Sequence, residues 1–160
     1  MQKFSTQPHI SDRELTLSRL IKAPREKVFR AWTEPELIKQ WFAPRPWTVA
    51  RAKTDVRPGG SNLIVMQNPD GEEFPASGVY LEVVRNELLV ITDAYTEAWL
   101  PSEKPFMTTI LTFEEADGNT KYTARARHWN VKDRKEHEKM GFHEGWSQCT
   151  DQLAELVLKL

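Results

Sequence analysis

Two of the four histidines in this chain are expected to face the interior of the fold, where an imidazole can contact a bound ligand. His128 ends an alternating run in which one parity holds two arginines and the other holds small residues. Because the arginines belong in water, we expect Ala124, Ala126 and His128 to face inward. His143 belongs to the apolar stripe of the last helical segment. An imidazole donates or accepts a proton near neutral pH, so either histidine can orient a ligand hydroxyl or carbonyl. An ordinary buried histidine is the competing interpretation.

Other reactive side chains give weaker signals. His137 and His143 are six residues apart, which places them about 120° apart around a helix, on different faces. The single cysteine, Cys149, excludes a multi-cysteine metal site and is expected to be a small buried side chain without a nucleophilic role. We therefore expect no metal and no cofactor. Three strand carboxylates are expected on solvated faces: Asp55, Glu82 and Asp93.

Aromatic residues form the second signal, since six Trp, seven Phe and three Tyr make the apolar fraction unusually bulky. Such side chains bind flat or hydrophobic ligands with few polar contacts, although core packing explains part of the set. Trp32 is expected to anchor the first helix. The predicted ligand site has a core of Phe42, Met107, Thr109, Ala126, His128, His143 and Trp146, and a rim of Trp41, Tyr95 and Trp99.

Length, charge and hydropathy exclude several classes of protein. A chain of 160 residues suits one domain, predicted here over residues 12–160 after a flexible lead-in over residues 1–11. A net charge of −1 gives no electrostatic footprint for nucleic acid. The longest apolar runs are four residues, as in Leu63–Met66, whereas a membrane span needs about 20. We expect a cytoplasmic protein without membrane insertion.

Hydrophobic periodicity then predicts the elements that position these residues. Two short helices, one over residues 25–33 and one that brings Leu37, Ile38 and Trp41 together, follow the first strand. A long amphipathic helix runs from Asp133 to the C-terminus, with Gly141 and Gly145 marking a bend or a close approach. Tight turns separate most strands, which indicates an antiparallel meander, and the longer 95–105 loop is a place for function. The predicted strands cover residues 14–21, 47–56, 61–68, 73–84, 87–94, 106–115 and 119–130.

This order and several motifs resemble the SRPBCC superfamily of START-like, helix-grip proteins. Within it, the chain is most similar to the subfamily of the activator of the ninety-kilodalton heat-shock protein ATPase, in its C-terminal-type domain. The resemblance implies an α+β helix-grip fold: a curved seven-stranded antiparallel sheet wrapped around a long C-terminal helix, with two short helices after the first strand. It is carried by Ala23-Pro24, Val28-Phe29, Trp32, Asp55-Val56-Arg57-Pro58-Gly59-Gly60, Gly78-Val79-Tyr80-Leu81-Glu82-Val83 and Gly145-Trp146-Ser147.

The resemblance also implies a function, namely binding of a lipid, polyketide or similar hydrophobic molecule in a cavity between the sheet and the C-terminal helix. A cyclase, aromatase-like or dehydratase enzyme using the same cavity is the first alternative, although no catalytic motif is recognisable. A module that modulates a chaperone ATPase is the second. A homodimer and a chaperone partner both stay open at this stage.

Overall fold

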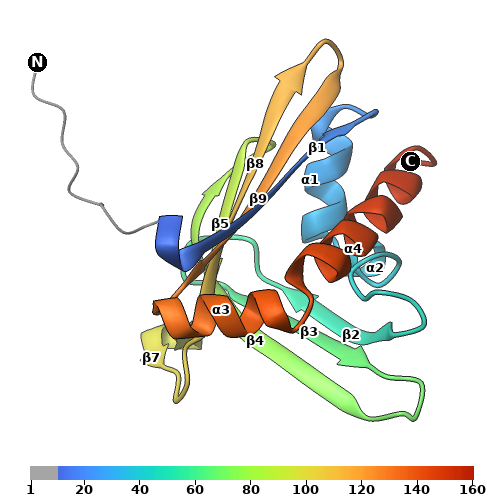
Figure 1. The fold of residues 1–160 in the computed structure, drawn as a ribbon. Coiled ribbons are helices and arrows are strands. Elements are labelled where there is room, and N and C mark those ends of the chain that lie inside the picture. The colour runs from blue at the N-terminus through green and yellow to red at the C-terminus, as the bar shows by residue number, and fades with distance from the viewer. Residues whose placement is uncertain (1–10) are drawn as a thin grey trace, which may run out of the picture.

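The domain is built on a curved seven-stranded antiparallel sheet with the strand order β1-β9-β8-β5-β4-β3-β2, and the helices pack against this sheet (Figure 1). The computed structural model describes residues 11–160, so the predicted lead-in over residues 1–11 lies almost wholly outside the described residues. The predicted α+β helix-grip architecture is confirmed. Among residues 11–160, no helix is both long and apolar enough to cross a membrane.

The strands follow the predicted periodicity closely, because alternation of apolar and polar residues is a local signal. The first and fourth strands have the predicted bounds, and the others differ at their ends by one or two residues. The sheet consists of β1 (Glu14–Ile21), β2 (Thr48–Thr54), β3 (Ser61–Gln67), β4 (Glu73–Val84), β5 (Leu88–Thr92), β8 (Met107–Ala116) and β9 (Asn119–His128). The predicted 95–105 loop contains a small hairpin of β6 (Tyr95–Thr96) and β7 (Leu100–Pro101), joined by a 3-10 turn, η2 (Glu97–Trp99).

Strand pairing fixes which side chains share the concave face of the sheet. In the β8–β9 ladder, Met107 pairs with His128, Thr109 with Ala126 and Leu111 with Ala124. Directly paired residues of antiparallel strands point to the same face. Since Leu111 and Ala124 are fully buried in the main core, all three pairs face the helices, as the parity of each strand predicted.

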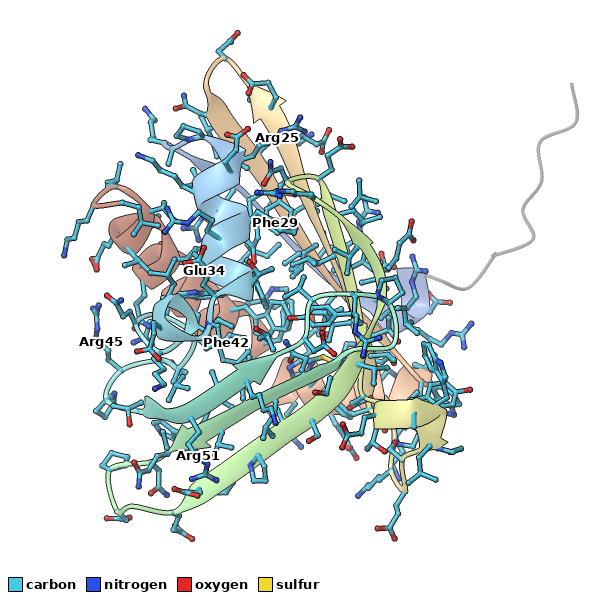
Figure 2. The ribbon with its side chains drawn as sticks, turned by 180° about the vertical axis from the view of Figure 1, so that it is seen from behind. Arg25, Phe29, Glu34, Phe42, Arg45 and Arg51 are labelled. Atoms are coloured by element: carbon cyan, nitrogen blue, oxygen red, sulfur yellow. The ribbon has the colours of Figure 1, made fainter. Side chains whose placement is uncertain are left out.

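The two short helices after β1 are α1 (Arg25–Thr33) and α2 (Pro35–Ile38), which bury the predicted apolar faces. Figure 2 shows Phe29 and Phe42 between these helices and the strands. Trp32 anchors α1 as predicted, because its ring is buried and its indole Nε1 donates a hydrogen bond to the Tyr122 hydroxyl at 3.1 Å. The first helices and the sheet are thereby joined through the core.

The C-terminal helix differs from the prediction, since it is interrupted. It begins as α3 (Val131–Lys139), where the Asn130 side chain caps the helix by accepting from the Asp133 amide at 2.8 Å. Gly141 then adopts a left-handed conformation with φ of 103°, which ends the helical path and starts α4 (Phe142–Val157). A residue without Cβ tolerates this conformation at little cost. The predicted bend is therefore a complete break at Gly141.

Candidate functional site

Five half-buried apolar side chains pack against two core clusters that Trp146 joins, and we call them the inner lining: Phe42, Ile91, Met107, Trp146 and Cys149. Cys149 Sγ donates to the Phe42 carbonyl oxygen at 3.2 Å, which joins α4 to the segment after α2. Met107 and Trp146 pack against one small cluster that includes Phe142. These contacts join α4, the segment after α2 and two strands of the sheet.

Several predicted site residues meet here. Phe42, Met107 and Trp146 belong to the inner lining itself. Thr109 and Ala126 are buried and directly paired on the same face, next to Met107 on β8. Ile91 pairs with Thr109 across β5 and β8, so the inner lining extends toward the middle of the sheet.

Trp41 does not lie at a rim. It is 3% exposed, its indole Nε1 donates to the Ala31 carbonyl oxygen at 2.9 Å, and its ring packs edge-on against Trp32 at 4.9 Å. The ring of Phe42 contacts both tryptophans at 5.4 and 5.7 Å. The expectation of a rim position is wrong for Trp41, because a buried indole needs a partner for its N–H and finds one in α1. Trp41 is instead a core residue whose ring packs against the ring of Phe42.

Tyr95 and Trp99 lie on the β6–β7 hairpin and are 37% and 50% exposed. Their rings contact each other at 5.7 Å, and Trp99 lies against Gly59 in the turn between β2 and β3. Figure 1 shows this hairpin below the sheet, at the end where α3 begins. The two rings form an exposed aromatic pair, and the ring contacts of Trp99 are with Tyr95 rather than with Trp41 or Trp146.

His143 was expected inside the site, and the structure places it outside. Its side chain is 56% exposed, and Nε2 lies 3.3 Å from the Glu138 carboxylate. His143 stands in the first turn of α4, where the preceding residue Phe142 takes the buried position. In α4 the inward positions are Phe142, Trp146 and Cys149 instead.

His128 is buried as predicted, and both of its ring nitrogens are engaged. Nδ1 lies 2.9 Å from the Arg13 carbonyl oxygen, and Nε2 lies 2.8 Å from Nδ1 of His137. A carbonyl only accepts, so Nδ1 of His128 carries the proton and Nε2 of the neutral ring is an acceptor. His137 Nδ1 must then donate to it. His128 therefore has no nitrogen left to orient a ligand.

His137 is the residue that the sequence interpretation missed. Burial and, secondarily, the neighbouring His128 lower the pKa of His137 to about 4. Its ring is surrounded by aromatic rings, with Phe142 at 5.1 Å, Phe106 at 5.2 Å and Trp146 at 6.2 Å. No period in the sequence links residues 128 and 137, because a loop and a helix start separate them. Apart from Val131, α3 is made of polar and charged residues, so its own sequence gives no signal that His137 faces inward.

A second polar feature lies farther along the concave face. Asn62 Nδ2 donates to the Tyr80 hydroxyl at 3.0 Å, and both side chains are buried. Burial raises the pKa of Tyr80, so its hydroxyl stays protonated and can donate a hydrogen bond. Tyr80 pairs with Ile91 across β4 and β5, which places this hydroxyl on the same side as the inner lining.

Burial raises the pKa of two further groups, the Asp93 carboxyl and the Cys149 thiol. Asp55 and Glu82 are exposed as expected, but Asp93 is half-buried and accepts from the Phe106 and Met107 amides at 2.9 and 3.1 Å. Burial raises the pKa of Asp93 despite these bonds. Burial also raises the pKa of the Cys149 thiol to about 12, so the thiolate is not formed at neutral pH. Cys149 is therefore a lining side chain without nucleophilic character.

No cluster of three or more His, Cys, Asp or Glu side chains within residues 11–160 has the arrangement of a metal site. Two open hollows are present on the described surface. One, of about 390 Å³, runs along the outer side of α3 at Lys132 and Lys135. The other, of about 440 Å³, lies between α1 and the β4–β5 turn, where Phe29 and Val83 reach the core. Neither is the predicted cavity between sheet and C-terminal helix, which stays a prediction.

Residues 22–158 match the model of the family described as activator of Hsp90 ATPase homolog 1-like protein. The chain belongs to this family. No curated protein matches the chain.

Solved structures agree with the family assignment. The family fold recurs in protein NE0264 from Nitrosomonas europaea, at 41% identity and a TM-score of 0.90, over 93% of this chain and 96% of that one. Protein Ms6760 from Mycobacterium smegmatis is 26% identical with a TM-score of 0.75, over 92% and 91%. A protein from Rhodobacter sphaeroides at 17% identity and a TM-score of 0.82, over 93% and 95%, shares the fold alone.

Proposed function

We propose that this Hsp90-ATPase-activator-like domain binds a small, flat, hydrophobic molecule against the inner lining. The observation that carries the proposal is the half-burial of five apolar side chains on the concave side, directly beside fully buried core residues. Apolar groups that face inward and still meet solvent are the surface that a ligand covers in a binding site. Burial of this surface supplies the binding free energy.

The two halves of α4 differ in how deeply their side chains are buried. Leu153, Leu156 and Val157 in the second half are 0 to 8% exposed and belong to the main core. Trp146 and Cys149 in the first half are only half-buried. α4 packs mainly on α1, β1 and α3. We expect a ligand to contact its first half, where the apolar side chains are only half-buried.

The polar groups near the inner lining define the ligand further. The Thr109 hydroxyl on β8 and the Tyr80 hydroxyl on β4 lie on the concave face, whereas His128 and His143 are engaged elsewhere. A mainly apolar ligand with one hydroxyl or carbonyl fits this setting, because few polar groups suffice to fix its orientation. The lipid or polyketide-like ligands that the sequence resemblance implies include molecules of this chemistry.

Fluorescence titration with N-phenyl-1-naphthylamine, an uncharged flat probe, tests the proposal. We expect saturable binding at one site. Cys149→Phe and Ile91→Phe fill the inner lining and should weaken binding by about tenfold or more, since roughly 1.4 kcal/mol of lost contact is a factor of ten. Val90→Phe is the matched control, because Val90 points to the opposite face of the same strand.

Thermal melts establish that each variant is folded before titration. Equal affinity in the wild type and in both filling variants would contradict the proposal, as would an equal loss in Val90→Phe. Native mass spectrometry of the protein from its source then identifies the co-purifying molecule.

The two alternatives from the sequence are distinguished by separate assays. A cyclase or dehydratase needs a titratable group free to exchange protons with a substrate, and a pH–rate profile lost in a histidine variant would identify it. Chaperone modulation rests on the family resemblance. A pull-down with the chaperone, together with its ATPase rate in the presence of this protein, tests that function directly.

A further inference from the structure

α3 differs from the other helices in how it is attached to the domain, because polar contacts take the place of buried apolar side chains. None of its nine residues is buried, whereas α1, α2 and α4 all bury side chains. Its inward contacts are the half-buried His137 and a hydrogen bond from Arg134 Nε to the Asp12 carbonyl oxygen at 2.9 Å. An imidazole therefore takes the place that an apolar side chain has in the other helices.

The bond between His128 and His137 depends on charge. With both rings neutral, His137 Nδ1 donates to His128 Nε2 at 2.8 Å. The first added proton goes to Nε2 of His137, whose Nδ1–H still donates to His128, but it places a cation among the Phe106, Phe142 and Trp146 rings. A second added proton gives two cations in direct contact, with a donor on each facing nitrogen and no acceptor between them, so the bond must break.

The charged groups around the pair do not offset a second proton. Arg127 is paired with Glu14 at 2.7 Å, and Arg134 with Glu138 at 2.8 Å. Asp93 is half-buried, and burial raises its pKa, so its negative charge is itself lost on acidification. The ionisable groups beside the pair on neighbouring elements are Asp12, Arg13, Glu14, Asp93, Arg127 and His143. Those of α3 itself, besides His137, are Lys132, Asp133, Arg134, Lys135, Glu136, Glu138 and Lys139.

α3 also covers one end of the inner lining. The His137 ring contacts Phe106, Phe142 and Trp146, and Trp146 belongs to the inner lining. Figure 1 shows α3 lying across the end of the sheet where β9 stops. Movement of α3 away from β9 would therefore expose this aromatic end.

We propose that α3 is an acid-released latch, held by the hydrogen bond between His128 and His137, whose opening exposes the Trp146 end of the ligand site. The regulatory part of this inference rests on the proposed ligand site, and the latch itself does not. Ligand is held at neutral pH and released, or exchanged, on acidification.

The direction of the pH effect follows from linkage. The pKa of His137 is lowered from 6.5 to about 4 when α3 is docked, so the docked helix favours the neutral ring. Docking is strongest above pH 6.5 and weakens as the pH falls toward 4. Allowing for partial solvent exposure of the ring, we expect the docking equilibrium to fall about tenfold between pH 7 and pH 5.

Hydrogen exchange of the α3 amides tests the latch, with protection factors corrected for intrinsic exchange rates at each pH. We expect α3 protection to fall about tenfold from pH 7 to pH 5 in the wild type, while α4 protection changes little. His137→Gln keeps a donor for His128 without a titratable ring, so its α3 protection should not depend on pH. His143→Gln removes the exposed histidine that pairs with Glu138 of α3, and the fall in α3 protection with pH should persist in this variant.

Protection that does not change with pH in the wild type would overturn the latch. A pH dependence that persists in His137→Gln would also overturn it and assign the effect to another ionisable group beside the pair, such as His128 or Asp93. The ligand arm measures dissociation of N-phenyl-1-naphthylamine, which should be about tenfold faster at pH 5 only where His137 is present. An α3 that opens without faster release overturns the regulatory role, and a probe that never binds is a failure of the proposed function alone.

Discussion

α4 buries Phe142, Thr150, Gln152, Leu153, Leu156 and Val157, whereas α3, separated from it by Met140 and Gly141, buries no side chain. Dispersion and the hydrophobic effect hold α4, and neither depends on protonation. α3 is held by directional bonds to the Arg134 and His137 side chains and by its Asn130 cap. Two helices that the sequence predicts as one therefore differ in what can detach them.

The largest effect is expected at Leu153, which is fully buried in the main core beneath α4. Leu153→Ala removes its apolar contacts and leaves a cavity, so the free energy of unfolding should fall by about 2–5 kcal/mol. Urea denaturation measures this loss. A loss below about 1 kcal/mol would show that α4 is not the main attachment of the C-terminal segment.

Gln152 extends the comparison to the polar contacts of α4. Its Nε2 donates to the Trp41 and Ala43 carbonyl oxygens, both at 2.8 Å. Gln152→Leu leaves these buried carbonyls without a partner, which should cost about 2–3 kcal/mol. The same variant should weaken probe binding, because Phe42 lies between the two carbonyls in sequence. Unchanged probe affinity would show that Phe42 is positioned by its ring contacts alone.

The junction between the helices offers a matched pair of glycines. Gly141→Ala places a Cβ at φ of 103° and should cost about 1–2 kcal/mol. Gly145→Ala lies within α4 with open space around the new Cβ and should stabilise by up to about 1 kcal/mol. Thermal and urea unfolding compare the two. Equal effects would contradict the break at Gly141.

The smallest effect is expected at the cap of α3. Asn130→Ala removes the bond to the Asp133 amide and should cost about 1 kcal/mol. Because α3 opens locally, hydrogen exchange of its amides should detect the loss, while global unfolding should hardly change. A full loss in global stability would mean that α3 unfolds together with α4, which would remove the difference between the two helices.

Much of the fold and part of the candidate site were predictable from the sequence. Strand β4 has the predicted bounds, and the inward parity of Met107, Thr109 and Ala126 is confirmed, because alternation places successive side chains on opposite faces. Trp41 and Phe42 were both expected at the site. Neighbours in sequence point in different directions after a short helix, and only packing against Trp32 shows which ring is buried and which lies in the inner lining.

The contacts of the histidines could not be predicted fully from the sequence. Local patterns along the chain predicted the strands, their antiparallel meander and the inward position of His128, since each depends on nearest-neighbour geometry. The helix-grip family was implied by a resemblance of motifs and is shown by the family match. The pairing of His128 with His137 depends on the left-handed turn at Gly141 and on the angle at which α3 meets β9. These are set by long-range packing, in which residues distant along the chain compete for one volume. For that reason His143 lies in solvent and His137 lies against the sheet.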